Sequence, residues 1–329
     1  MDWANIFENA LRASIAKDAI VYALAAIGLN LHFGYTGLLN FGQAGFIAVG
    51  AYGTAITVDY FDQSIWLGLV ASVVSAIVFA LLLGVPTLRL RVDYLAIVTI
   101  AAGEIIRLTF RSVSLREVTG GSSGLQAFAG DFYAVNPFPD GTYGFGPFAF
   151  SESRFWLLVA AWTLVALSAL LVYLLMHSPW GRVIKSIRED EDAARSLGKN
   201  VYWYKMQSLI LGGVIGALGG IVFCIATQSV VPDNYATQVT FFGYTILILG
   251  GVARVGGPIV GSVLFWLILA LTDNLLRQAI GAGYIPENIL ATSELGIVRF
   301  ALVGLGLMLL MIYRPQGIFG DRKELALDA

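Results

Sequence analysis

The feature that most constrains this chain is a series of long apolar runs that carry almost no charge. Crossing a bilayer takes about 20 predominantly apolar residues. Two of the runs, 94–108 and 241–253, are short enough to be tilted, broken or re-entrant. The pattern predicts an all-α polytopic membrane protein, a single transmembrane domain over 1–329, with about eight or nine transmembrane or half-spanning helices. All candidate runs lie near 19–33, 41–60, 65–85, 94–108, 155–177, 207–228, 241–253, 257–276 and 297–313.

Composition agrees with a protein surrounded by lipid. Hydrophobic residues make up 57% of the chain, charged residues 13%, and the mean hydropathy is +0.77, whereas soluble domains carry about 25% charged residues. The formal net charge is −2 and no basic patch stands out, so no nucleic-acid partner is expected. The start of the chain lacks a basic region before its apolar residues, which argues against a removed signal peptide.

The sequence lacks the motifs that a catalyst or a metal site needs. With one cysteine and two histidines, the chain can form neither an internal disulfide nor a metal cluster. No G-x-x-x-x-G-K-[ST] motif is present, which excludes ATP binding of the P-loop kind. We therefore predict no catalytic residues, no metal and no cofactor. Energy for transport has to come from a partner or from an ion gradient.

Two long polar segments predict the orientation of the chain. Six basic residues fall within the 29 residues of 178–206, but three within the 46 residues of 109–154. Because cytoplasmic loops keep an excess of Lys and Arg, 178–206 is predicted to be a cytoplasmic loop and 109–154 an extracytoplasmic loop. Counting spans back from these loops puts the N-terminus outside and the C-terminus inside.

The cytoplasmic loop is expected to contain one short helix that lies across the membrane face. Pro179 suits the first helical turn, and Gly198 suits the end of the helix. From charge alone, the segment could equally be a solvated loop that only sets topology. The order Asp192-Ala193-Ala194, three further residues and Gly198 closely matches the EAA-x3-G pattern of ABC-importer permeases, with Asp in place of Glu.

The resemblance extends beyond this motif. The frame SPWGRVIKSIREDEDAARSLGKNVYWYKMQSLILGGVIGALGGIVF resembles the permeases of branched-chain amino-acid ABC importers along its whole length. Further blocks similar to the family are GYTGLLNFGQAGFIAVGAY, TLRLRVDYLAIVTIAAGEIIRLTF, VTGGSSGL, GYTILILGGVARVGGPIVGSVLF and RPQGIFG, which together cover most of 20–320. The length, the T-G-G loop and the R-P-x-G-I-F-G end resemble the M-type member of the permease pair.

The resemblance implies a transport subunit of the bacterial plasma (inner) membrane. Its implied partners are a second homologous permease, two cytoplasmic ABC ATPases and an extracytoplasmic substrate-binding protein. The cytoplasmic segment would dock into a groove on an ATPase through the coupling residues Gly181, Arg188, Glu189, Asp192, Ala193, Ala194 and Gly198. A stand-alone ion-coupled secondary transporter or channel, or an ABC permease for urea, amides or sugars, remains an alternative.

Glycines recur at helical spacing in two parts of the chain. The stretch 34–53 holds six glycines in twenty residues. Small residues on one helix face let neighbouring helices approach closely in lipid. Gly34 and Gly37 are expected to mark a bend or break before this span, and a second break is expected in LGGVARVGGPIVG. Helix packing is predicted for Gly42, Gly45, Gly50, Gly53, Gly212, Gly216 and Gly220.

Polar side chains inside the apolar runs are the remaining candidates for function. The tetrapeptide Phe-Gly-Tyr-Thr opens both glycine-rich regions, at 33–36 and 242–245, and transporters often place their pathway where interrupted segments meet. Uncharged polar groups suit a neutral zwitterion, so the pathway candidates are Tyr35, Asn40, Gln43, Thr99 and Gln228. The charged candidates, Glu104 with Arg107 and Asp273 with Arg277, predict local ion pairs, with a gate or a contact with the substrate-delivering protein as the alternative.

Overall fold

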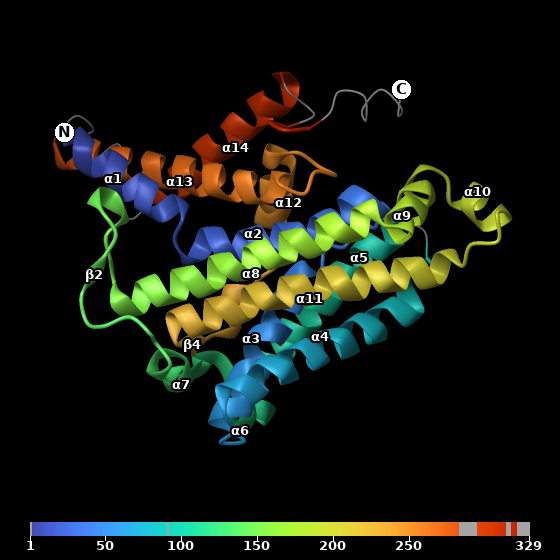
Figure 1. The fold of residues 1–329 in the computed structure, drawn as a ribbon, viewed down its shortest axis with the longest axis horizontal. Helices are drawn as coiled ribbons and strands as arrows, with labels where there is room; N and C mark the ends of the chain where they lie inside the picture. Colours follow the sequence, from blue (N-terminus) through green and yellow to red (C-terminus); the bar gives the residue numbers. More distant parts are fainter. Residues whose placement is uncertain (1, 91, 283–294, 314–316, 321–329) are drawn as a thin grey trace.

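The computed structural model describes residues 2–90, 92–282, 295–313 and 317–320, and these residues are mostly helical (Figure 1). The longer helices are α1 (Trp3–Ser14), α2 (Lys17–Leu29), α3 (Gln43–Asp59), α4 (Ile65–Thr87), α5 (Val92–Arg111), α8 (Glu152–His177), α9 (Pro179–Glu189), α11 (Val201–Thr227), α12 (Gln238–Gly250), α13 (Gly257–Gly281) and α14 (Leu295–Tyr313). The short ones are α6 (Arg116–Thr119), α7 (Gly130–Ala134) and α10 (Glu191–Ser196). The all-helical fold class is thereby confirmed.

Every apolar run of the sequence coincides with a helix. Within the described residues, α4, α8, α11 and α13 are long and apolar enough to cross a bilayer, and α1 with the bent continuation 17–35 makes a fifth if the pair is one span. The 41° bend falls at the junction of α1 and α2. The helix α12 has 13 residues, too few to cross alone at about 1.5 Å per residue. The total of eight or nine transmembrane or half-spanning helices stays a prediction.

The helix α11 lies at the centre of the bundle. It packs against α2, α3 and α4. Of its most apolar 18-residue window, 67% is buried, compared with 39% for α8 and 28% for α13. Glycines allow this close packing, because a side chain at Gly220 would overlap the carbonyl of Ile47 in α3. By contrast, α8 keeps one apolar side exposed, which includes Leu167, Leu170, Leu171 and Leu174, as expected of a helix that faces lipid.

The glycines of α3 and its N-cap contact three different helices. Gly42 and Gly45 lie against α5, beside Thr99 and Gly103, and Gly53 lies against Ser72 of α4. Gly50 meets α11, where the Cβ of a substituted residue would be 2.7 Å from the Cα of Ala217. The glycine face that the sequence pattern predicts on α3 is therefore broad. It packs against three helices at the centre of the bundle rather than against one. On α11, Gly212 and Gly216 lie beside His32 and Gln43.

The two long polar segments lie at opposite ends of the bundle (Figure 1). At one end, α9 and α10 extend from the ends of α8 and α11. The other end carries α6, α7 and two small antiparallel pairings: β1 (Leu125–Gln126) with β4 (Ser229–Val230), and β2 (Thr142–Tyr143) with β3 (Phe150–Ser151). The N-terminal helix α1 contacts this second end through residues 146–148, so α1 and the segment 109–154 lie on the same side.

Candidate functional site

The helix α9 is fixed against the bundle by its buried face. Pro179 stands in its first turn, and Gly181, Ile184 and Ile187 are buried. The space beside Gly181 is filled by the carbonyl groups of the last turn of α8, so a side chain there would push the two helices apart. At the other end of α9, Nη1 of Arg188 donates to the carbonyl of Gly34 at 2.6 Å. This bond joins α9 to the region where the chain leaves α2.

The expectation of one helix from Pro179 to Gly198 is wrong, because the chain breaks at Asp190. That residue has φ −152° and ψ 106°, and its carboxylate accepts hydrogen bonds from the backbone N–H groups of Asp192 and Ala193, both at 2.9 Å. An Asp that caps its own downstream backbone competes with a continuing helix. The result is two helices, α9 and α10. Gly198, with φ +76°, follows the end of α10 in the left-handed conformation, which glycine adopts without steric cost.

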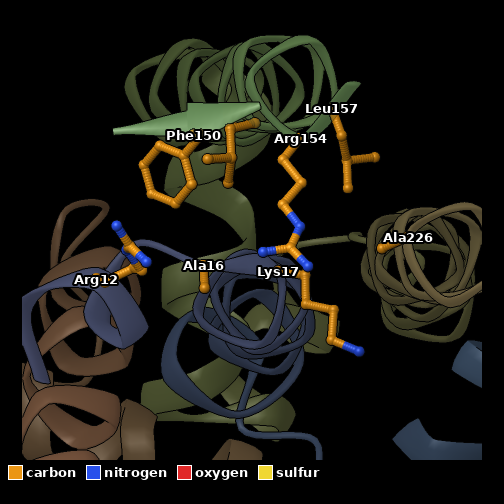
Figure 2. A pocket seen from close by; sticks show the side chains of 8 residues that line it. Arg12, Ala16, Lys17, Phe150, Arg154, Leu157 and Ala226 are labelled. Carbon is orange, nitrogen blue, oxygen red and sulfur yellow. The ribbon is translucent and has the colours of Figure 1, made fainter. Parts of the chain in front are cut away.

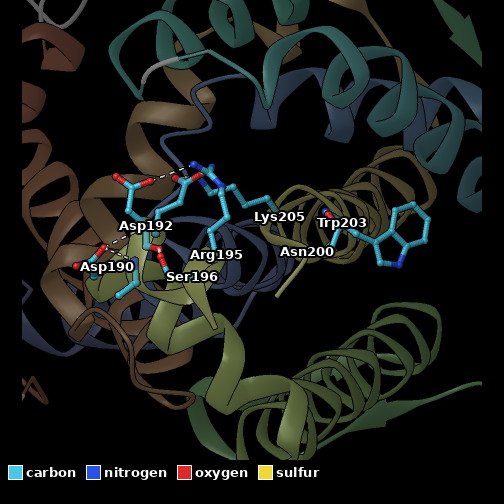
Figure 3. A network of polar contacts seen from close by, with 9 residues as sticks. Asp190, Asp192, Arg195, Ser196, Asn200, Trp203 and Lys205 are labelled. Atoms are coloured by element: carbon cyan, nitrogen blue, oxygen red, sulfur yellow. Dashed lines mark hydrogen bonds and ion pairs between the residues drawn. The ribbon is translucent and has the colours of Figure 1, made fainter. Parts of the chain in front are cut away.

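Charged side chains attach α10 to the start of α11 (Figure 3). Glu191 pairs with Arg195 at 2.8 Å and also with Lys205 of α11. Arg195 in turn pairs with Asp192 at 3.0 Å. Asn200 caps α11 by accepting from the N–H of Trp203 at 3.1 Å. These bonds hold α10 in a defined position although most of its surface is exposed.

The coupling candidates divide into buried and exposed residues. Ala194 is 2% exposed and packs with Ile187 and Val201, whereas Ala193, Glu189, Asp192 and Gly198 are exposed. Leu197, which sequence reasoning missed, is 79% exposed at the end of α10. The sequence does contain a signal for this site, because Leu197 is a large apolar residue in an otherwise polar segment. An exposed leucine among charges is a typical contact for a protein partner.

A second set of candidates lies inside the bundle, where the chain between α2 and α3 is not a regular helix. After α2, residues Asn30–Tyr35 form a π-helical turn (η1), and the stretch 37–42 has no helical structure. Gly37 has φ +73°. Irregular backbone at this depth needs hydrogen-bond partners from its surroundings, since lipid supplies none. Thr36 contributes to this by bonding the hydroxyl of Ser208 at 2.7 Å.

Asn40 is the centre of the network that satisfies this segment. Its Oδ1 accepts from the N–H of Gly42 at 2.9 Å, and its Nδ2 lies 3.3 Å from Oε1 of Gln43 and 3.1 Å from Nδ1 of His32. The other ring nitrogen of His32, Nε2, lies 3.1 Å from the carbonyl of Leu209 in α11. His32 is fully buried, and sequence reasoning missed it because its partner Asn40 follows eight residues later, across the break.

The pathway candidates occupy two separate places. Tyr35, Asn40, Gln43 and Thr99 are 3%, 1%, 0% and 0% exposed. Gln43 donates to the carbonyl of Gly212 at 3.3 Å, and Thr99 accepts from the N–H of Phe41 at 3.0 Å. Gln228 instead is exposed at the end of α11, where its own carbonyl accepts from the N–H of Ala127 at 2.8 Å. Its role in a pathway stays a prediction that is independent of the other four.

The two glycine-rich breaks meet inside the protein. The segment 251–256 separates α12 from α13, and Gly251 and Ala253 have positive φ of 114° and 58°. Asn30 bridges the breaks: its Nδ2 donates to the carbonyl of Arg254 at 2.9 Å, and its Oδ1 accepts from the N–H of Ala253 at 2.9 Å. Tyr244 of α12 donates to the carbonyl of Asn40 at 3.0 Å. Hydrogen bonds of the buried Asn30 and Tyr244 thus join both regions.

The charged candidates extend into larger ion-pair groups. Arg107 pairs with Glu104 at 2.5 Å and with Asp233 at 2.7 Å, and Asp233 also pairs with Arg111 at 3.2 Å. Asp233 belongs to the 3-10 turn η5 (Pro232–Tyr235), so this group ties the end of α5 to the segment after α11. Asp273 pairs with Arg277 at 2.8 Å and, in addition, with Arg299 of α14 at 3.2 Å. The partners Asp233 and Arg299 are distant in sequence, and spacing gave no sign of them.

Removing the side-chain amide of Asn40 is expected to destabilise the protein. An Asn40→Leu variant keeps the number and branching of the side-chain heavy atoms but leaves polar atoms of His32, Gly42 and Gln43 without their partner in a buried site. We expect a loss of about 2–3 kcal/mol in folding free energy, measured by thermal unfolding of the purified protein in detergent. Asn9→Leu, at an exposed position of α1, is the matched control. Unchanged stability with weakened substrate binding would instead make Asn40 a substrate contact.

An apolar helical bundle with polar segments at opposite ends and two interrupted segments that meet at buried amides defines a multi-pass membrane protein of the transporter class. The family described as "Branched-chain amino acid transport system / permease component" matches residues 11–313. The chain therefore belongs to this permease family.

Individual relatives agree with the family. The chain is 31% identical over 317 residues to the high-affinity branched-chain amino acid transport system permease protein LivM of Salmonella typhimurium, covering 92% of this chain and 69% of that protein. It is 26% identical over 344 residues to the probable LivM of Methanocaldococcus jannaschii, covering 92% and 91%. A solved structure, PsaBC from Streptococcus pneumoniae in complex with Fab, is similar with a TM-score of 0.43 and 14% identity, covering 91% of this chain and 90% of that one. The two LivM relatives confirm the resemblance to M-type permeases.

Proposed function

We propose that this chain is the M-type permease subunit of an ABC importer for branched-chain amino acids in the bacterial plasma membrane. The observation that carries the proposal is the family match over residues 11–313, which includes both helix breaks and the segment with α9 and α10. The chain has no P-loop motif, so ATP hydrolysis belongs to partner subunits. Its role is non-catalytic: it forms part of the translocation pathway.

The residues at the two ends of the bundle indicate where each proposed partner would bind. A cytoplasmic ATPase dimer would contact the end of α10, where Leu197 and Ala193 are exposed. A second homologous permease would complete the pathway, and a substrate-binding protein would deliver the amino acid at the opposite end. There, the ion pairs of Arg107 and Asp233 hold the outer end of α5 in place. Movement of the ATPases would reach the buried break through α9, because Arg188 bonds the carbonyl of Gly34.

Reconstitution tests the proposed function directly. The tagged chain is purified in mild detergent from its source cells, and proteins that co-purify are identified by mass spectrometry. We expect two ATPases and a second permease. In liposomes, this complex with its binding protein should take up leucine, isoleucine or valine only when ATP is present on the ATPase side. Competition by urea, amides, nucleosides and sugars defines the substrate class.

Two results would contradict the proposal. Uptake by the purified chain alone, driven by an ion gradient and without any ATPase, would make it a secondary transporter or channel. ATP-driven uptake that branched-chain amino acids do not compete for, but urea, an amide or a sugar does, would keep the ABC permease class and overturn the substrate.

A further inference from the structure

A cavity of about 300 Å³ lies between α1, α2, α8 and α11, at the end of the bundle that carries the segment 109–154. Three cationic side chains line it: Arg12, Lys17 and Arg154. The rest of the wall is mainly apolar, and includes Phe150 and Leu157 (Figure 2). The combination of a cationic cluster with an apolar wall indicates an anionic ligand that also has an apolar part.

The cations of this cavity carry charge that the surrounding protein does not balance. The side chain of Arg154 reaches from the first turn of α8 into the cavity (Figure 2), and within the described residues no hydrogen bond or ion pair engages it. Arg12 is held by neutral groups, since it donates to the carbonyls of Pro147 and Ala149 at 3.0 and 3.1 Å. The ammonium of Lys17 lies 5.3 Å from the centre of the Phe223 ring.

Among the described residues, no carboxylate forms an ion pair with Arg12, Lys17 or Arg154. Asp18, which interacts with Lys17, is half-buried in the first turn of α2. The carboxylate of Glu152 is directed to the neighbouring loop, where it accepts from the N–H of Gly141 at 3.4 Å and from the hydroxyl of Ser153 at 3.1 Å. The three cations that line the cavity are therefore without an ion-pair partner in the described part of the chain. The cavity is thus positively charged and suited to bind an anion.

The position of the cavity matches the depth of lipid headgroups. It lies where the long helices α8 and α11 begin and end, and α2 begins there as well. Next to it, the indole N–H of Trp162 donates to the carbonyl of Ile15 at 3.0 Å, and tryptophans concentrate at this level of a bilayer. On α1, an apolar stripe at four-residue spacing is exposed: Trp3 by 54%, Phe7 by 53% and Leu11 by 37%. Such a stripe is suited to contact with lipid.

We propose that this cavity binds the phosphate group of an anionic phospholipid, with Arg154 and Arg12 as the donors. Guanidinium groups bind phosphate through charge-assisted hydrogen bonds. The apolar wall, with Phe150 and Leu157, would contact the glycerol and the upper part of an acyl chain. Free phosphate would use the cations but gain nothing from the apolar wall, which favours the lipid.

Lipid retention by the purified chain tests the proposal, and the assay does not depend on transport. Native mass spectrometry measures how much dioleoyl-phosphatidylglycerol or dioleoyl-phosphatidylcholine stays bound at equal lipid concentration. We expect a preference for phosphatidylglycerol. Because each cation near the membrane surface contributes about 1 kcal/mol, Arg154→Gln should weaken phosphatidylglycerol binding about fivefold and Arg12→Gln plus Arg154→Gln about 25-fold.

Matched variants separate the cavity from general surface charge. Arg116→Gln removes an exposed arginine of α6 at the same end of the bundle and should leave binding unchanged, while Arg154→Lys should retain most of it. Equal binding of phosphatidylglycerol by the wild type and the double variant would overturn the proposal. Displacement of the lipid by inorganic phosphate at equal concentration would show a site for soluble anions and would overturn it too, as would displacement by leucine.

Discussion

A Gly50→Ala variant is expected to be strongly destabilised. The added methyl group would lie 2.7 Å from both the Cα and the carbonyl carbon of Ala217, and it would overlap the carbonyl oxygen of that residue. All three atoms belong to the backbone of α11, so no rotation of a side chain can relieve the overlap. The helices α3 and α11 would have to separate at the centre of the bundle. We expect a cost of about 3 kcal/mol, the upper range for an overpacked core.

The measurement is fluorescence-detected gel filtration with thermal challenge in detergent. Gly50→Ala should lower the midpoint of unfolding and broaden the elution peak. Gly304→Ala in the middle of α14 makes the same chemical change where, within the described residues, the added methyl group would have no atom of another segment within 4 Å. Since alanine is the better helix former, this control should be neutral or slightly stabilising. Equal stability of both variants would show that α3 and α11 do not pack as closely as in this structure.

The glycine pattern also shows how much of the fold the sequence predicts. Helical spacing is a local property, so the runs 41–60 and 207–228 correctly indicated helices with small faces, now seen as α3 and α11. Which helices those faces meet depends on the order in which the chain packs, and spacing holds no information on it. Gly45, Gly50 and Gly53 thus share a face in the sequence but contact α5, α11 and α4 in the structure.

The same difference between local patterns and contacts between distant segments holds for the candidate site. Asn40 and Gln43 were identified by residue type within a charge-free run, but His32, Asp233 and Arg299 were missed because their contacts cross breaks or join separate helices. Local capping chemistry explains the other error. In the sequence, Asp190 is one of four consecutive acids at 189–192, whereas in the structure its carboxylate caps α10 and ends α9. Charge counting sets topology, but the position of an acid relative to backbone N–H groups sets helix boundaries.

The burial of each residue decides which substitutions test a partner contact of the cytoplasmic segment. Ala194→Arg would place a charged side chain among Ile187 and Val201, where Ala194 is 2% exposed, so loss of function would report disruption of α10 itself. Ala193 is exposed on the same helix, and Ala193→Arg would instead block a partner that approaches closely. Leu197 offers the cleaner test because 79% of its surface is exposed, so replacing its side chain removes little internal packing.

A Leu197→Asn variant is expected to fold normally and to lose ATPase association and amino-acid uptake. Burying a leucine in a partner's groove contributes about 1.5–3 kcal/mol, so replacing it with an amide of similar size should weaken association about 10- to 100-fold. Co-purification of the ATPases and ATP-driven leucine uptake in liposomes measure the effect. Leu115→Asn, at a 38% exposed leucine of the segment 109–154, changes the same residue type at the opposite end and should preserve both activities.

Full association and uptake in Leu197→Asn would remove the end of α10 from the ATPase contact, whereas loss in both variants would point to a general effect on the membrane domain. The salt pairs of Glu191 with Arg195 and Lys205 hold α10 in either variant, so a selective defect in Leu197→Asn would assign the contact to that side chain.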